Sequence, residues 1–315
     1  MEVALGGALG APLGGSPAVL AVSSKFISLT AAGISQGAIV ALAAVGFLLV
    51  YKATGVVNFA QGDLITLGAY LALWLTRDFD APILAAYAGA IALMFLIGVV
   101  LERVAYAPLR GRSIHVVVIA TLGAAIVIRT VIALWLGASP VALDSPARGH
   151  LWRVGGAAIP LQRIVIVVVT LLVVAGLTWL FGPTAFGRQV RALAADRETA
   201  RLHGVRSARL SMVAFGLSAA LAGLAGVLIG PANSSFDITL GFSVMLGGFA
   251  AAILGGFGSL TGVVIGGFLI GLVEQLFGGY VLRDYRGAYP FLLMILVIAL
   301  RPQGLLSGRA AHERL

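Results

Sequence analysis

Residues 164–181 read IVIVVVTLLVVAGLTWLF, a run without a single charged side chain. A helix needs about 20 apolar residues to cross the hydrocarbon core of a bilayer, so a run of this length is typical of a membrane-spanning helix. The strands of a membrane β-barrel instead alternate apolar and polar residues over about 10 positions. The run therefore predicts a helical membrane protein and argues against a barrel.

The composition of the whole chain agrees with this prediction. Of the 315 residues, 60% are hydrophobic and 10% are charged, whereas an ordinary soluble domain has roughly 25% charged residues. Cysteine is absent, which excludes disulfides and thiolate chemistry. The four histidines are too scattered to indicate a metal site. The net charge is +9. In a membrane protein, basic residues in the loops set the orientation of the chain, so this charge does not indicate nucleic-acid binding.

Apolar runs between charged or turn-rich breaks give candidate membrane spans. They cover residues 26–51, 55–76, 81–101, 114–136, 161–181, 210–230, 240–257, 260–278 and 288–300. Because the last is short and the second is unusually polar, we expect an all-α polytopic membrane bundle of about 8–10 spans in one domain. Small residues recur four apart, as in Ser218, Ala222 and Gly226, which predicts close contacts between helices.

Arginines set the expected orientation, because short loops rich in Lys and Arg stay in the cytoplasm. The densest cluster lies in residues 182–209, with Arg188, Arg191, Arg197, Arg201, Arg206 and Arg209. If this segment is inside, counting the spans places the amino terminus outside and the carboxyl terminus in the cytoplasm. Arg148, Arg153 and Arg163 then fall on the outer side, against the rule.

The sequence carries no motif for nucleotide hydrolysis or catalysis. A P-loop ends in Gly-Lys followed by Ser or Thr, and neither Lys25 nor Lys52 follows a glycine. Residues 256–262 resemble a dinucleotide-binding fingerprint only loosely, and their place between apolar runs favours helix packing. We therefore expect that the chain is not an enzyme and binds no cofactor, and that any ATP and Mg²⁺ are used by partner chains.

The stretch GVVNFAQGDLITLGAY at residues 55–70 is unusually polar for a candidate span. At helical spacing Asn58, Gly62 and Thr66 share one face, with Gln61 and Asp63 on either side of it. An ionised carboxylate and two amides facing lipid would be costly, so we expect protein or a water-filled cavity around them. Two roles stay open. In the first, the five residues form part of a translocation pathway or gate. In the second, Asp63 lies near the cytoplasmic interface and the polar cluster is structural.

Arg129 and Glu274 are charged residues well inside candidate spans. Each costs a few kcal/mol at the bilayer centre unless it reaches the interface or a partner. For Arg129 we favour reach to the interface over contact with a substrate. Glu274 is shorter and is expected to face the bundle interior, as a further pathway or gate residue. A pair between Arg129 and Glu274 also stays open.

Residues 186–205 differ from the apolar runs around them. Good helix formers extend from Gln189 to Leu202, and Gly204 follows as a C-terminal stop. The pattern predicts a short cytoplasmic helix. The alternative is a solvated basic loop whose arginines only set the topology.

Four stretches together resemble the LivH-type permease subunit of ABC importers for branched-chain amino acids. Residues 33–42, GISQGAIVAL, resemble its opening span, and residues 58–70, beginning NFAQGD, resemble its most characteristic stretch. Residues 187–205 are similar to its coupling loop. Residues 255–274 and 301–305, the latter RPQGL, are similar to its closing region.

The resemblance implies a transmembrane permease domain at residues 25–306. Residues 1–24 match nothing in the family and are expected to be a flexible external segment, and residues 307–315 are expected to be a cytoplasmic tail. The resemblance also implies a bacterial cytoplasmic membrane and four kinds of partner: a homologous LivM-type permease, LivG- and LivF-type ATPases, an external solute-binding protein and the lipid bilayer. The residues that would couple to an ATPase, all in the coupling loop 182–209, are Arg188, Arg191, Ala194, Asp196, Arg197, Ala200 and Gly204.

The substrate stays open among branched-chain amino acids, other amino acids, amides and urea. A competing class is a secondary transporter or channel that acts without an ATPase, in which Asp63 and Glu274 would couple the substrate to protons or ions. ATP dependence separates the two classes, because an importer subunit alone in liposomes is expected to be inactive.

Overall fold

The computed structural model describes residues 17–147, 149–154, 156–281, 283–301 and 304. Most of them are helical. The α-helices are α1 (Pro17–Thr54), α2 (Gln61–Asp78), α3 (Ile83–Leu101), α4 (Ile114–Leu136), α5 (Leu161–Phe181), α6 (Ala185–Ala195), α7 (Arg197–Leu202), α8 (Ser207–Ile229), α9 (Leu240–Gly255), α10 (Leu260–Tyr280) and α11 (Tyr289–Leu300). The short helical turns are η1 (Glu102–Tyr106), η2 (Ala107–Leu109), η3 (Gly230–Ala232) and η4 (Arg283–Ala288).

Each expected span contains one of these helices, and the polytopic helical bundle is confirmed. Within the described residues, six helices are long and apolar enough to cross a bilayer, namely α1, α3, α4, α5, α8 and α10. The other three spans contain shorter or more polar helices. α9 and α11 have 16 and 12 residues, and α2 carries Asp63, Arg77 and Asp78.

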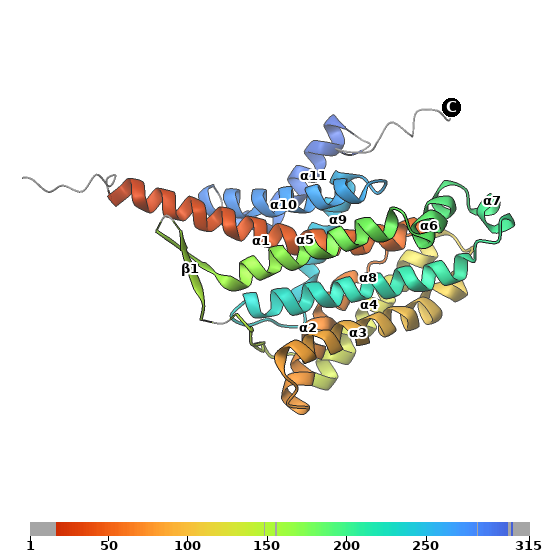
Figure 1. The fold of residues 1–315 in the computed structure, drawn as a ribbon, viewed down its shortest axis with the longest axis horizontal. Coiled ribbons are helices and arrows are strands. Elements are labelled where there is room, and N and C mark those ends of the chain that lie inside the picture. Colours follow the sequence, from red (N-terminus) through yellow and green to blue (C-terminus); the bar gives the residue numbers. More distant parts are fainter. Residues whose placement is uncertain (1–16, 148, 155, 282, 302–303, 305–315) are drawn as a thin grey trace, which may run out of the picture.

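A small β-hairpin between α4 and α5 was not predicted from the sequence. Strands β1 (Leu151–Val154) and β2 (Ala157–Pro160) pair antiparallel, with Leu151 opposite Pro160 and Val154 opposite Ala157. The hairpin lies at one end of the bundle, and α6 and α7 lie at the other (Figure 1). We call these the hairpin end and the α6 end.

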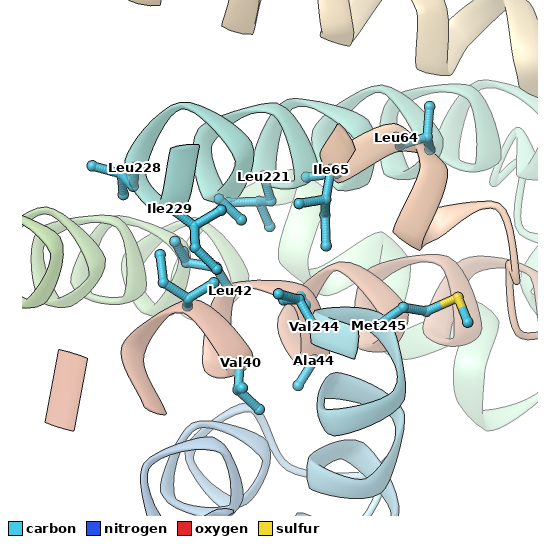
Figure 2. Packing of buried hydrophobic residues seen from close by; sticks show 14 of the residues in the cluster. Val40, Leu42, Ala44, Leu64, Ile65, Leu221, Leu228, Ile229, Val244 and Met245 are labelled. Atoms are coloured by element: carbon cyan, nitrogen blue, oxygen red, sulfur yellow. The ribbon is translucent and has the colours of Figure 1, made fainter. Parts of the chain in front are cut away.

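α1 is the central helix of the bundle. Its residues 38–50 are all buried, as expected of a helix that is apolar on every side. α10, α8, α9 and α5 pack around it. Figure 2 shows the core where Leu42 of α1, Ile65 of α2, Leu221 of α8 and Val244 of α9 converge.

Glycines let the helices around α2 approach very closely. A Cβ on Gly241 of α9 would lie 1.9 Å from the carbonyl oxygen of Gly62. A Cβ on Gly226 of α8 would lie 2.1 Å from the carbonyl oxygen of Ile65. No side chain fits at either position, so the close contact expected for Gly226 is confirmed and the first turns of α2 are fixed between α8 and α9.

The chain ends fall partly outside the described structure. α1 begins at Pro17, within the stretch expected as the external segment 1–24, while residues 1–16 lie outside the described residues. The tail expected at 307–315 also lies outside them.

Candidate translocation site and coupling segment

α2 starts later than the sequence predicted. The expected span begins at residue 55, but residues 55–60 are not helical and α2 begins at Gln61. Asn58 is therefore not on a helical face with Gly62 and Thr66, and that prediction is wrong. The physical reason is local, because the Asn58 Oδ1 accepts a hydrogen bond from the Ala60 N–H at 3.1 Å and closes a turn before the helix.

Asp63 and Arg129 form an ion pair between α2 and α4. The Arg129 Nε donates to Asp63 Oδ1 at 2.8 Å, and its Nη2 donates to Oδ2 at 3.2 Å, so both carboxylate oxygens are used. The Asp63 side chain is 4% exposed and that of Arg129 is 37% exposed. The sequence did not predict this pair, in which the Arg129 guanidinium binds Asp63 in a bidentate arrangement.

This ion pair lies deep in the bundle. Arg129 comes 15 residues after Ile114, the first residue of α4, which is about 22 Å along the helix. The whole of α4 has 23 residues, or about 34 Å. Asp63 thus pairs with a residue beyond the middle of α4, because residues 55–60 carry the chain back among the helices before α2 begins. This depth favours an enclosed position over one at the cytoplasmic interface.

A second polar contact joins α1, α2 and α8. The Gln61 side chain is fully buried, and its Nε2 donates to the Ser218 carbonyl oxygen at 3.4 Å. The Ser218 hydroxyl lies 2.9 Å from Gln61 Oε1 and 2.9 Å from the Gly46 carbonyl oxygen, either of which can accept its proton. Ser218 is the twelfth of the 23 residues of α8, so this contact also lies at mid-helix.

The remaining polar residues of this stretch are enclosed as well. Thr66 is 1% exposed, and its hydroxyl oxygen accepts the Gly241 N–H at 3.0 Å, which ties α2 to the start of α9. Asn58 is 1% exposed, and its Nδ2 has no hydrogen-bond partner among the described residues. The prediction that Asn58, Gln61 and Asp63 are surrounded by protein is confirmed.

Asp237 holds the turn that leads into α9. Its carboxylate accepts the Thr239 hydroxyl at 2.6 Å and the Thr239 N–H at 2.8 Å. These hydrogen bonds favour the ionised carboxylate and lower the pKa of Asp237. The turn therefore brings a fixed negative charge close to the start of α9.

Glu274 lies elsewhere in the bundle. It is half-buried on α10, which packs mainly against α1, α9 and α11. α2 packs mainly against α8, α3, α9 and α4. The structure therefore does not bring Glu274 into the polar group that Asn58, Gln61, Gly62, Asp63 and Thr66 form around the start of α2.

The coupling loop forms two helices, not the single helix expected from Gln189 to Leu202. α6 ends where Asp196 adopts an extended backbone, with φ −152° and ψ 114°. The Asp196 Oδ1 accepts the N–H groups of Glu198 and Thr199 at 2.9 and 3.2 Å. An aspartate that binds backbone N–H groups in this way starts a new helix, which explains the break despite good helix formers on both sides.

The arginines of α6 contact the end of α5. Arg191 donates to the carbonyl oxygen of Phe181, and to that of Gly182 at 3.1 Å. Arg188 donates to the carbonyl oxygen of Pro183 at 2.5 Å. The last carbonyl groups of a helix lack partners within the helix, so cationic side chains stabilise this end of α5 and hold α6 against it.

The other coupling residues differ in exposure. Ala194 is exposed and lines a groove of about 690 Å³ together with Lys52 of α1 and Phe257 after α9. Ala200 is 5% exposed and packs inside the segment. Gly204 has a φ of 81°, as expected of a C-terminal stop. The side chain of Arg197 lies outside the described part of the structure.

A second ion pair, near the α6 end, was missed from the sequence. Glu102 is fully buried in η1, and its Oε1 pairs with the Arg110 guanidinium and accepts the Ser211 hydroxyl at 2.7 Å. Its Oε2 has no hydrogen-bond partner among the described residues. Oppositely charged side chains on one helix pair when they are three or four residues apart. Glu102 and Arg110 are eight residues apart, so their spacing did not predict the ion pair.

An apolar helical bundle that encloses an ion pair and two amides at mid-helix, and carries a basic segment at one end, is the architecture of a membrane transport protein. Comparison with known sequences is more specific. Residues 29–298 match the family described as branched-chain amino acid transport system / permease component. The chain belongs to this family of permease components.

Individual relatives support the same assignment. The high-affinity branched-chain amino acid transport system permease protein LivH of Escherichia coli K12 is 34% identical, over 90% of this chain and 95% of that protein. BraD of Pseudomonas aeruginosa, a permease protein of the same kind of system, is 35% identical over the same shares. A solved structure, PsaBC from Streptococcus pneumoniae in complex with Fab, is 15% identical with a TM-score of 0.41, over 89% of this chain and 90% of that chain.

Proposed function

We propose that this chain is the permease subunit of an ATP-driven importer for branched-chain or related amino acids. The observation that carries the proposal is the family match over residues 29–298. The sequence has no motif that would hydrolyse ATP, so the energy would come from ATPase chains that bind Mg²⁺ and ATP. The chain itself would be non-catalytic and would bind no cofactor.

The proposed assembly contains a homologous LivM-type permease, LivG- and LivF-type ATPases and an external solute-binding protein. The six arginines of residues 182–209 support placing the α6 end in the cytoplasm. The hairpin end and the amino terminus would then be outside, and the carboxyl terminus inside.

The polar group around the start of α2 would form part of the pathway or its gate. Asp63, Arg129 and Gln61 are polar side chains at mid-helix depth in an apolar bundle, and such residues commonly mark transport routes. In the competing class, Asp63 and Glu274 would couple transport of the substrate to protons or ions. The bidentate contact with Arg129 occupies both carboxylate oxygens of Asp63, which favours the importer over a carboxylate that is free to bind protons or ions.

Reconstitution tests the class of transporter. The chain, its partner permease and the ATPases in proteoliposomes are expected to take up leucine only with ATP and the binding protein present. The chain alone is expected to be inactive. Uptake by the chain alone, driven by a proton or sodium gradient, would overturn the proposal.

Cysteine labelling tests the orientation, since the natural chain has no cysteine. Ala208 at the start of α8 and Ala158 in β2 are both exposed. We expect an impermeant maleimide to label Ala158→Cys in intact cells and to label Ala208→Cys only after permeabilisation. The opposite pattern would reverse the topology.

The coupling role of α6 and α7 has its own test. Ala194→Glu places a charge in the groove next to Lys52, and Gly204→Val places a β-branched residue at positive φ. Both are expected to preserve insertion but to weaken ATPase binding and abolish uptake. Ala192→Glu adds the same charge at another exposed position of α6 and is the control. Normal ATPase binding and uptake by both test variants would exclude the coupling role.

A further inference from the structure

A cavity of about 360 Å³ lies near the hairpin end, between α1, α5, α10 and the turn that follows α8. Its lining contains both polar and aliphatic residues. The polar residues are Ser28, Ser35 and Gln36 of α1, Arg163 of α5, Asn233 after η3 and Gln275 of α10. Branched aliphatic side chains come from Ile39, Ile166 and Ile229.

These aliphatic side chains form a deeply buried part of the lining. Ile39 and Ile166 are each 1% exposed, and Ile229 is 6% exposed. They belong to the main hydrophobic core of the bundle. A pocket of a few hundred Å³ with an apolar wall and a few converging polar groups is typical of a site for a small molecule.

Arg163 is the unusual group in the cavity. It is half-buried, and its Nη1 donates to the Ser28 carbonyl oxygen at 3.3 Å. Arg129 and Arg110 each have a carboxylate partner, whereas Arg163 forms no ion pair with any carboxylate of the described residues. A guanidinium has five N–H donors in a planar fork that fits a carboxylate. Arg163 therefore has donors to spare for an anionic group inside the cavity.

We propose that this cavity binds an aliphatic α-amino acid. Arg163 holds the α-carboxylate, the side-chain amides of Gln36 and Asn233 face the α-ammonium group, and Ile39, Ile166 and Ile229 contact the aliphatic side chain. The substrate class rests on the proposed function, while the cavity and its polarity do not. The site also gives a reason for Arg163 at the hairpin end. That end is proposed to be outside, where arginines are disfavoured.

The cavity and the polar group around the start of α2 lie along the same face of α1. Ile39 and Gly46 are seven residues apart on α1, which places them on the same helical face about 10 Å apart. Gly46 is the residue whose carbonyl oxygen meets the Ser218 hydroxyl beside Gln61. A molecule in the cavity thus sits two helical turns from the buried amide of Gln61.

Protection of a single cysteine tests the proposal in the assembled transporter in nanodiscs. Ala32 lines the cavity and Ala158 is exposed on the hairpin outside it. Leucine is expected to slow maleimide labelling of Ala32→Cys but not of Ala158→Cys. Isopentylamine, which is leucine without its carboxylate, is expected to give no protection.

The arginine is tested in the Ala32→Cys background. Arg163→Gln is expected to weaken protection by leucine by about tenfold or more, the effect typical of a lost charge-assisted hydrogen bond, and Arg163→Lys by less. Arg153→Gln removes the same charge from an exposed position of β1 and is expected to leave protection unchanged. The comparison of leucine with isopentylamine remains decisive even if the Arg163 variants fail to fold.

The possible results separate the cavity from the transport function. A transporter that imports leucine but shows no leucine protection at residue 32, or equal protection by isopentylamine, overturns the proposed site and leaves the proposed function standing. Protection that requires the carboxylate and Arg163, in an assembly that imports no branched-chain amino acid, supports the site and overturns the function. Protection by the ligand-free binding protein, unchanged by leucine, would assign the cavity to protein docking and overturn the site.

Discussion

The two ion pairs of the described structure differ in how they satisfy the oxygens of a buried carboxylate. Asp63 and Arg129 are 66 residues apart in sequence and join two helices, and both carboxylate oxygens are bonded. Glu102 and Arg110 are eight residues apart in one connection. One oxygen of Glu102 serves both Arg110 and Ser211, and the other has no described partner.

The comparison indicates that burial alone does not decide how many hydrogen bonds a carboxylate needs. Its depth in the bundle matters as well. Both carboxylates are almost fully buried. Asp63 lies deep in the bundle, and both of its oxygens are bonded by protein. Arg110 and Ser211 line a cavity of about 180 Å³ near the α6 end, which has room for water.

The largest effect is expected from breaking the deep pair. Arg129→Met leaves the buried carboxyl group of Asp63 without its cationic partner, and is expected to destabilise the protein by about 3–5 kcal/mol. Thermal unfolding of the purified protein in detergent measures the loss. The double variant Asp63→Asn/Arg129→Met removes both charges and is expected to recover much of the stability. No recovery would mean that the pair is not the source of the loss.

An intermediate effect is expected from disturbing the helix contact beside that pair. Gly241→Ala forces the start of α9 away from the Gly62 carbonyl oxygen, and over-packing of this kind destabilises by about 1–3 kcal/mol. Gly123→Ala on α4 is the control, since a Cβ there meets nothing within 4 Å. It is expected to be neutral or to stabilise by up to about 1 kcal/mol. Equal effects of the two variants in the same unfolding assay would contradict the packing argument.

The smallest effect is expected from the pair near the α6 end. Glu102→Gln keeps one oxygen for Arg110 and Ser211 and removes only the charge, so we expect a loss of about 1 kcal/mol. The same unfolding assay ranks this variant against Arg129→Met. A loss as large as that of Arg129→Met would refute the distinction between the two pairs.

The helices were predictable from the sequence because apolar run length is a local property. The nine expected stretches each hold a helix, and Gly204 has the positive φ that its position suggested. Local competition for backbone hydrogen bonds explains the errors. Asn58 and Asp196 each bind a backbone N–H with a side-chain oxygen, and so delay α2 and divide the coupling helix.

Long-range contacts of the candidate site were not predictable in this way. That Gln61 and Asp63 are enclosed follows from the cost of polar groups in lipid. Their partners do not follow, because Ser218 and Arg129 are distant in sequence and nothing in helical periodicity links them. The same holds for Glu102 and Ser211, which are 109 residues apart.

The separation of Asp63 from Arg129 also affects how the protein is made. The ribosome delivers Asp63 to the membrane 66 residues before Arg129, and an aspartate without a partner opposes insertion, by up to about 2.5–3.5 kcal/mol when it lies at the centre of the bilayer. α2 is therefore expected to stay near the translocon until α4 arrives, so that α1 to α4 enter the bilayer as one unit. In chains truncated before Ile114, a single cysteine in α2 should stay accessible to an aqueous maleimide, whereas in chains that extend past Gly137 it should be protected.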